Sequence, residues 1–546
     1  MSYIEQEQFT ILDSNENKKL KSESLVTIKE ASLCASNYLN RKITDSNISY
    51  LVQYGKIKKY NIDGKTLINL KELKSYYNSY YGSREIRWKQ KLGNDLNWSL
   101  SFDHLREKDT TKHVHRLHPY KGKFIPQLVE YFLNNHINSF KKEIYFKKGD
   151  IVLDPFSGSG TTLVQANELD INSIGIDISY FNCLITETKL FDYDLLSLEN
   201  EVIEILDKII NFESKNKIKA FENELLILLS RFNSIYFPSP EFKYKVNQVM
   251  IDEDTYGEDK EKIFLPVYYN LINKYKIKLE QDESNTFLDK WYVNNVRNEI
   301  DYAYNLINEV KNENNKKILT IILSRTIRSC RATTHSDLAT LKKPQLTTYY
   351  CHKHKKICKP IFSIKDKFSR YATDTLRRLR DFSKLKTDAY FTVIPGDSRN
   401  INIFEEIKNK NRDFYEILKK QKIKGIFTSP PYVGNIDYHE QHAYAYELFQ
   451  FERKDNLEIG PLCKGKGEAA RKSYIKGISE VLNNCKKYLI NDFDIFIVAN
   501  DRYNLYPKIA YNSEMKIVNK FKRPVLNRTE RDKNPYSEII FHLKRI

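Results

Sequence analysis

DIVLDPFSGSGTT, at residues 150–162, is the stretch of this sequence that decides the fold. Its apolar residues predict a short strand that ends at Asp154, because a proline follows immediately. Gly158 and Gly160 predict a loop whose backbone can approach a ligand closely, since glycine has no side chain. The two threonines and the apolar residues behind them, up to Ala166, predict a helix. A strand, a glycine-rich turn and a helix form the first half of a nucleotide-binding α/β unit.

Two common glycine-loop motifs do not fit this stretch. A phosphate-binding P-loop needs a lysine after its last glycine, and Thr161 stands there. A dinucleotide fingerprint needs a third glycine, and Leu163 occupies that position. The loop therefore suits a nucleoside ligand without a pyrophosphate. A second apolar run, 173–178, contains Asp177 about 20 positions further along, the spacing at which an acidic residue accepts hydrogen bonds from ribose hydroxyls.

The strings DPFSGSGTT and GIDIS together resemble the S-adenosylmethionine (SAM) site of DNA methyltransferases that act on exocyclic amino groups. The resemblance implies an α/β fold with a Rossmann-like methyltransferase sheet and SAM as methyl donor. The segment HPYKGKF at 118–124 is similar to the one these enzymes place before the glycine loop, and the strand ending at Asp397 is similar to the one beside the adenine of the cofactor. The resemblance implies these cofactor-binding residues: Tyr120, Lys123, Phe124, Asp154, Pro155, Phe156, Gly158, Gly160, Thr161, Thr162, Asp177, Ile178 and Asp397.

The tetrapeptide Ser429-Pro430-Pro431-Tyr432 resembles the catalytic turn of the same family. An exocyclic base amine is a poor nucleophile, because its lone pair is delocalised into the ring. Acceptors that favour a tetrahedral nitrogen release that lone pair towards the methyl group. The hydroxyl of Ser429 and the carbonyl of Pro430 are the candidate acceptors, and the two prolines stiffen the turn. Tyr432 offers a ring on which a base flipped out of the duplex can stack.

The first letter of this motif bears on the target base. In the family that the sequence resembles, Ser-Pro-Pro-Tyr mostly accompanies methylation of cytosine N4, whereas Asp- or Asn-Pro-Pro-Tyr is typical of adenine N6. Methylation of cytosine carbon-5 needs a cysteine nucleophile, normally after a proline, and no cysteine of this chain follows a proline. We therefore expect site-specific cytosine-N4 methylation of double-stranded DNA, in restriction–modification or phage defence. The alternatives are adenine-N6 methylation and a DNA-binding regulator with an inactive core.

Composition supports a polyanionic partner. The 546 residues carry a formal charge of +18 and a pI of about 9.2, which suits DNA, although a lysine-rich background composition can also produce such a charge. Seven cysteines without a regular framework indicate a reducing compartment. The polar N-terminus has no signal-peptide core, and no apolar run approaches membrane-spanning length. We expect a cytoplasmic protein without membrane contact, and the resemblance adds a cognate restriction endonuclease as an expected partner.

The order of these patterns divides the chain. Residues 24–80 predict two helices, two short strands around an Asp63-Gly64 turn and a last helix, which resembles excisionase-like or MerR-like DNA-binding modules. Residues 191–385 have helical periodicity and are too long for a loop. We expect a flexible leader at 1–23, a winged helix-turn-helix module at 24–80, the first part of the methyltransferase core at 81–190, a mainly helical insert at 191–385 and the second part of the core at 386–546.

Two features of the insert bear on function. It is rich in arginine at 325–331 and 377–380, so we expect it to recognise the target sequence, with the N-terminal module adding affinity. It also holds ligand-type residues close together, namely Cys351, His352, His354 and Cys358, with Cys330 and His335 nearby. Their spacing matches no common zinc signature. We therefore expect no metal, and interpret these residues as buried thiols and basic surface histidines.

Overall fold

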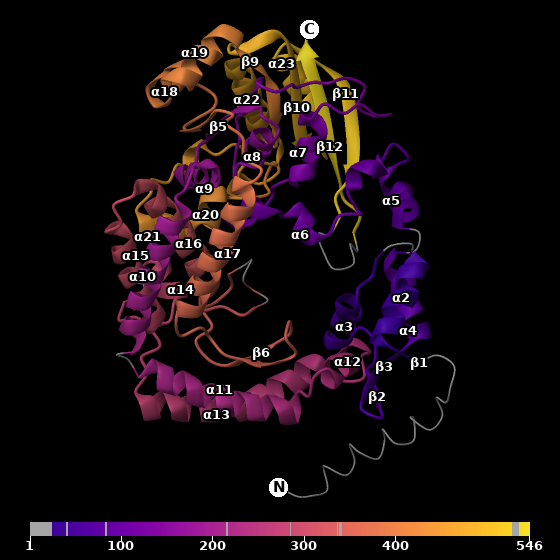
Figure 1. Cartoon of the computed structure of the whole chain (residues 1–546), viewed down its shortest axis with the longest axis vertical. Coiled ribbons are helices and arrows are strands. Elements are labelled where there is room, and N and C mark those ends of the chain that lie inside the picture. Colours follow the sequence, from indigo (N-terminus) through magenta and orange to yellow (C-terminus); the bar gives the residue numbers. More distant parts are fainter. Residues whose placement is uncertain are drawn as a thin grey trace, which may run out of the picture.

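The computed structural model describes residues 25–39, 42–81, 84–214, 217–283, 285–335, 337, 341–526 and 534–546. The leader expected at 1–23 lies outside these ranges. Figure 1 shows a sheet with its helices at one end of the molecule, a long helical segment beside and below it, and a small N-terminal unit that adjoins one end of that segment. Within the described ranges, no helix is both long and apolar enough to cross a membrane.

A seven-stranded sheet forms the centre of the larger part. Its strands run in the order β11-β12-β10-β9-β4-β5-β8. The pairs among β10, β9, β4, β5 and β8 are parallel, and β12 is antiparallel to both of its neighbours. The strands are β4 (Ile151–Asp154), β5 (Asn172–Asp177), β8 (Phe391–Pro395), β9 (Ile423–Thr428), β10 (Leu489–Ala499), β11 (Met515–Pro524) and β12 (Ser537–Arg545). The connections reverse direction at β4, and ligands of such sheets bind at the carboxyl ends of the strands beside that reversal.

Both faces of the sheet are buried at the central parallel strands β4, β5 and β9, as apolar runs without alternation require. Ile151 and Leu153 of β4 pack into one apolar cluster, and Val152 between them packs into the other, because successive side chains of a strand point to opposite faces. The helices of this part are α5 (Arg84–Leu92), α6 (Glu107–Thr110), α7 (Pro126–Leu133), α8 (Thr161–Glu168), α9 (Tyr180–Leu190), α18 (Ile403–Lys410), α19 (Arg412–Gln421), α20 (Tyr438–Gln441), α21 (Ala443–Phe449), α22 (Glu468–Lys486) and α23 (Tyr506–Asn512).

Helices separate β5 from β8 in the chain. They share a large apolar core with α9 and α21, which joins the helical segment directly to the region of the glycine loop. A two-stranded hairpin interrupts the helices before α17. The elements are α10 (Leu195–Ser214), α11 (Ile218–Tyr236), α12 (Glu241–Asn247), α13 (Glu253–Tyr275), α14 (Phe287–Trp291), α15 (Asn294–Asn308), α16 (Glu313–Cys330), β6 (Tyr349–Cys351), β7 (Lys356–Cys358) and α17 (Lys365–Ser383).

Three arginines of this segment bind groups inside the protein. Arg325 is buried and donates to Asp374 Oδ2 at 2.8 Å. Arg378 donates to the same carboxylate at 2.9 Å and to the carbonyl of His113 at 2.9 Å. Arg331 is also buried, with its guanidinium 5.7 Å from the centre of the Tyr444 ring. The expectation that this arginine-rich stretch faces DNA is therefore wrong for these three side chains, because they bind groups inside the protein.

The N-terminal unit has a three-stranded sheet in the order β1-β3-β2. Thr44 caps α3 with its side chain, and the turn between β2 and β3 has positive φ at Asp63 and at Gly64, which suits a two-residue hairpin. Its elements are β1 (Leu25–Thr27), α2 (Ile28–Leu39), α3 (Asp45–Gln53), β2 (Tyr60–Ile62), β3 (Lys65–Asn69) and α4 (Leu70–Tyr81).

The N-terminal unit docks on α12 of the helical segment (Figure 1). Asn247 donates to the carbonyls of Tyr54 and Gly55 at 3.0 and 2.9 Å, and Lys243 donates to the carbonyl of Gln53 at 3.3 Å. Gly55 has a φ of +64°, and a Cβ there would lie 2.5 Å from the backbone nitrogen of Tyr244. The end of α3 therefore contacts α12 so closely that only glycine fits at position 55.

Gly55→Ala should release this docking. Gly64→Ala is the matched control, since Gly64 also has a positive φ, of +73°, but a Cβ there meets nothing within 4 Å. Both variants place alanine in left-handed backbone, which costs roughly 1–2 kcal/mol, so the variants differ only in the contact with α12. We expect faster hydrogen exchange at α12 in Gly55→Ala than in Gly64→Ala. Equal exchange in the two variants would contradict the interface.

Candidate functional site

A cavity of about 860 Å³ lies at the carboxyl ends of β4, β5 and β8. It is the place that the topology of the sheet predicts for a ligand. Its lining includes eleven of the thirteen expected cofactor residues and two of the four expected catalytic residues. These are Tyr120, Lys123, Phe124, Asp154, Pro155, Phe156, Gly158, Thr161, Asp177, Ile178, Asp397, Ser429 and Pro431.

The glycine loop forms one wall of this cavity. Gly158 has a φ of +51°, and a Cβ there would lie 3.0 Å from the hydroxyl of Tyr120. Gly160, at the start of α8, has a φ of +73°, and a Cβ there would lie 2.4 Å from the side chain of Thr186. Gly160 does not line the cavity, so its glycine is required for packing against α9. The loop needs both glycines for backbone geometry, and only Gly158 borders the ligand space.

Asp177 holds the loop from the end of β5. Its Oδ2 accepts from the backbone nitrogen of Gly158 at 2.8 Å, and its Oδ1 accepts from Ser179 N at 2.9 Å and from Asn182 Nδ2 at 3.1 Å. Burial raises the pKa of Asp177, and these donors oppose the rise. A carboxylate has about four acceptor positions, so the three bonds leave capacity for a ligand hydroxyl.

Asp154 joins the glycine loop to the strand before the Ser-Pro-Pro-Tyr turn. Its Oδ1 accepts from the hydroxyl of Thr428 at 2.6 Å and from the backbone nitrogen of Phe156 at 3.2 Å. Burial raises its pKa to about 6, and the hydrogen bonds from Thr428 and from the backbone nitrogen of Phe156 limit the rise. Thr162 is fully buried and donates to the carbonyl of Phe427 at 3.2 Å. Thr162 therefore contacts the strand β9 and does not line the cavity, although the family resemblance implied that it binds the cofactor.

The segment before the glycine loop covers the cavity. The ring of Tyr120 lies 5.8 Å from that of Tyr438 in a stacked arrangement, and Phe124 packs edge-on against Phe427. Lys123 donates to the carbonyl of His115 at 2.6 Å, and burial lowers its pKa to about 8. The ammonium of Lys123 is thus already engaged by a protein acceptor.

Asp397 lines the cavity from the end of β8, but its carboxylate has a partner. Arg399 donates to it through Nε at 2.9 Å and through Nη2 at 2.6 Å. This two-point pairing fixes the direction of the carboxylate. Arg399 also donates to the carbonyl of Leu457 at 3.2 Å, so it ties the end of β8 to the segment after α21.

The Ser-Pro-Pro-Tyr turn stands between two cavities. Ser429 and Pro431 line the first, and Tyr432 lines a second of about 700 Å³. Pro430 appears in the lining of neither. The hydroxyl of Tyr432 donates to Glu538 Oε1 at 3.0 Å, and burial raises the pKa of this tyrosine. The second cavity is rich in aromatic and polar side chains, including Tyr474, Asn500, Asp501, Tyr503, Tyr506 and Tyr536.

Several lining residues had no signal in the sequence analysis. Ser157 Oγ, Ser159 Oγ and Asn182 Oδ1 are buried and have no hydrogen-bond partner among the described residues, and all three residues line the first cavity. Buried polar atoms are normally paired, so these atoms indicate a polar ligand. Tyr438 and Glu458 border the cavity from a segment after the Ser-Pro-Pro-Tyr turn. That segment has no spacing that marks it before folding.

The lining fits SAM. Apolar side chains such as Phe156 and Ile178 suit the adenine, and the buried carboxylate of Asp154 and the partly buried carboxylate of Asp177 suit hydroxyl and ammonium donors. The unpaired serine hydroxyls supply further polar contacts. Among the lining residues Lys123 is the one lysine or arginine, and its ammonium is bound to a carbonyl, as suits a ligand without phosphates.

Comparison with known proteins agrees with this geometry. A model of the N6/N4 methyltransferase family, described as DNA methylase, matches residues 3–188. Type II methyltransferase M.MjaII of Methanocaldococcus jannaschii is 50% identical over 527 residues, which cover 96% of this chain and 97% of that protein. Type II methyltransferase M.BsoBI of Geobacillus stearothermophilus is 36% identical over 121 residues, 22% of this chain and 21% of that protein. Orphan methyltransferase M.BamHII of Bacillus amyloliquefaciens is 32% identical over 131 residues, 23% of this chain and 44% of that protein.

The identity to M.MjaII extends over nearly the whole of both chains, and thus over the sheet, the helical segment and the N-terminal unit. The cavity at the carboxyl edge of the sheet has the lining that a SAM-dependent enzyme needs. The chain therefore belongs to the type II DNA methyltransferases of the N6/N4 family, which use S-adenosylmethionine as methyl donor.

Proposed function

We propose that this protein methylates the N4 amine of cytosine within a specific sequence of double-stranded DNA, as the companion of a restriction endonuclease. The observation that carries the proposal is the position of Ser429 and Tyr432, which line two adjacent cavities from one turn. A methyl transfer needs the donor and the acceptor amine on the two sides of one short gap. The Ser-Pro-Pro-Tyr turn suits this requirement because it borders both cavities.

The first cavity holds the cofactor. SAM, when bound, supplies an electrophilic methyl group on a sulfonium. Asp177 accepts from the ribose hydroxyls, while its bonds to Gly158 and Ser179 keep the glycine loop in place. Tyr120 closes the cavity over the loop. Asp154 and Asp397 act mainly through Thr428 and Arg399, so we assign them positioning roles as well as contact with the ligand.

The second cavity receives the flipped base. The ring of Tyr432 is held by its hydrogen bond to Glu538, so it offers a fixed stacking face. The hydroxyl of Ser429 and the carbonyl of Pro430 accept hydrogen bonds from the amine and favour a tetrahedral nitrogen. Stacking rings on several sides offset part of the cost of flipping a base, which is a few kcal/mol.

Cytosine is favoured over adenine by the serine at position 429. The family association of Ser-Pro-Pro-Tyr with cytosine supports this choice. Adenine N6 is the second candidate, because both bases present an exocyclic amine to the same acceptors. A regulator with an inactive core is disfavoured by the intact turn and by the unpaired polar atoms in the first cavity.

The N-terminal unit and the helical segment together engage the DNA. We infer that the N-terminal unit is a winged helix-turn-helix module, from its helix–helix–hairpin–helix order and the exposed face of α3. Its docking on α12 supports a single recognition surface shared with the helical segment. The formal charge of +18 favours phosphate binding that weakens as salt rises.

Expression of the protein in a host without DNA methylation tests the proposed reaction. We expect nucleoside mass spectrometry of that host's DNA to detect N4-methylcytosine, and sequencing of the modified bases to place it in one motif. N6-methyladenine instead would establish the second candidate. Unmodified DNA, together with SAM binding by the purified protein, would contradict catalysis and favour the regulator.

Two single substitutions should separate the two cavities. Asp177→Ala removes a ribose acceptor and an anchor of the glycine loop, so SAM affinity should fall by roughly 1–3 kcal/mol. Ser429→Ala removes an acceptor for the target amine, so turnover should fall while SAM affinity stays nearly unchanged. Calorimetry with SAM and single-turnover methylation measure the two effects. Asp192→Ala, which removes an exposed carboxylate close to α9, is the control and should change neither.

The opposite pattern would overturn the assignment. Unchanged SAM affinity in Asp177→Ala would remove Asp177 from the cofactor site. Loss of SAM binding in Ser429→Ala would place that hydroxyl at the cofactor and not at the base.

A further inference from the structure

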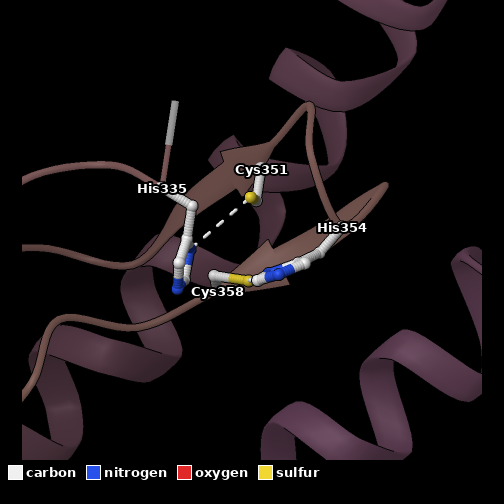
Figure 2. Close-up of side chains that lie close together, drawn as sticks. All are labelled: His335, Cys351, His354 and Cys358. Atoms are coloured by element: carbon white, nitrogen blue, oxygen red, sulfur yellow. Dashed lines mark hydrogen bonds between the residues drawn. The ribbon is translucent and has the colours of Figure 1, made fainter. Parts of the chain in front are cut away.

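Four ligand-type side chains of the helical segment converge on one point (Figure 2). Cys351 ends β6, Cys358 ends β7, and His354 lies in the turn between the two strands. In the register of this hairpin Cys351 pairs with Lys356 and Tyr349 with Cys358, so the two cysteines share one face of the hairpin. His335 reaches the same face from the chain that follows α16, well before the hairpin in sequence.

The distances match tetrahedral coordination. Cys351 Sγ lies 3.6 Å from His335 Nδ1, and Cys358 Sγ lies 3.5 Å from His354 Nδ1. All four ligand atoms lie within 4.8 Å of one another. Zinc binds sulfur at about 2.3 Å and nitrogen at about 2.0 Å, which puts neighbouring ligand atoms of a tetrahedral site about 3.5 Å apart. The four side chains therefore need only small rotations to surround an ion.

We propose that His335, Cys351, His354 and Cys358 bind one structural zinc ion. Two thiolates and two imidazoles are the donor set that favours zinc over magnesium or calcium. Four protein ligands close the coordination shell, so the site offers no open position for a water or a substrate. The sequence-based expectation of no metal rested on the absence of a second closely spaced pair of ligands. In the structure His335, from the segment after α16, completes the set of four.

The hairpin itself supplies a reason for a metal. Each of its strands has three residues, and the only buried apolar residues on this face are Tyr349, Cys351 and Cys358, a separate small cluster within the described part of the chain. The opposite face packs into the large helical core through Tyr350 and Ile357, so the face with the two cysteines is the one with little core, and regions with little core are commonly stabilised by a metal. Both thiols are free and buried, so they are available as ligands.

Two other groups of ligand-type residues in the described chain have a different explanation. Glu168 lies 2.9 Å from His113 Nε2, and the ammonium of Lys112 bonds its other oxygen at 2.5 Å. That lysine already supplies the positive charge a metal would bring. Glu458 binds the ring of His439 directly and accepts from the backbone nitrogen of the same residue at 2.9 Å. None of the four side chains in the cysteine-containing group has a lysine or arginine side chain among its hydrogen-bond and ion-pair partners within the described chain.

The ion would fix two parts of the helical segment to each other. The hairpin is held to α11 by Asn233, which exchanges two hydrogen bonds of 3.0 Å with Ile357, and to α13 by Glu261, which accepts from Tyr350 N at 2.8 Å. His335 lies four positions after Arg331, whose guanidinium packs on the ring of Tyr444 in α21. A zinc ion would thus connect the hairpin, which is bound to α11 and α13, to the segment that follows α16.

Metal analysis of the full-length protein tests this proposal. Protein purified without chelators or metal-affinity resin should contain one equivalent of zinc by elemental mass spectrometry. Replacement by cobalt should give the visible bands of a tetrahedral site and the near-ultraviolet bands of thiolate ligands. Cys351→Ser and Cys358→Ser should each lower zinc retention by more than about tenfold while SAM binding, which uses a separate cavity, persists.

Two matched variants are the controls. His352→Ala changes the neighbouring histidine of the same turn, whose ring binds Glu253 at 3.0 Å, and Cys463→Ser changes an exposed cysteine elsewhere. Both should retain zinc. If the cysteine variants do not fold, cobalt binding by the wild-type chain still decides the question. A metal-free wild-type protein, zinc retention by the cysteine variants, or a Cys351–Cys358 disulfide in its place would refute the site.

Discussion

The hydrogen bond from Thr428 to Asp154 connects the two halves of the site. The carboxylate is buried at the end of β4 and accepts this bond at 2.6 Å, while Thr428 ends β9 immediately before Ser429. Strands β4 and β9 are parallel neighbours, so their ends meet at one edge of the sheet. The glycine loop leaves one strand and the Ser-Pro-Pro-Tyr turn leaves the other. Burial disfavours the ionised form of Asp154, so the hydrogen bonds from Thr428 and from the backbone of Phe156 are needed to stabilise it. The position of the glycine loop therefore depends on the position of the Ser-Pro-Pro-Tyr turn.

The helical segment is packed tightly against the methyltransferase sheet and its helices. It shares an apolar core with α9 and α21, and Arg325, Arg377 and Arg378 all pair with the partly buried carboxylate of Asp374. Its α12 carries the N-terminal unit through backbone contacts at Gly55. Exposed arginines such as Arg377 and Arg380 and the lysines of the surface contribute to the formal charge of +18, which suits binding to phosphates.

The sequence was sufficient for the parts that depend on local chemistry. A strand, two glycines with positive φ and a helix follow directly from residues 150–162, and the Asp63-Gly64 turn follows from its dipeptide. Most of the cofactor residues that the family resemblance implied also line one cavity. The remainder depends on partners that are distant in the chain. Arg325 was expected to face DNA, whereas the fold places Asp374, 49 positions later, beside it. His335 was noted near the cysteines, but only the fold shows that its ring meets Cys351.

A double-mutant cycle on Thr428 and Asp154 tests the central claim most directly. Thr428→Val removes the hydroxyl at nearly constant volume, and Asp154→Ala removes the acceptor. The quantity to measure is kcat/KM for DNA methylation in the two single variants and the double variant. If the hydrogen bond couples the glycine loop to the catalytic turn, the two effects should be non-additive, with a coupling energy on the order of 1–3 kcal/mol. Additive effects would mean that the two loops are positioned independently, and would contradict the account.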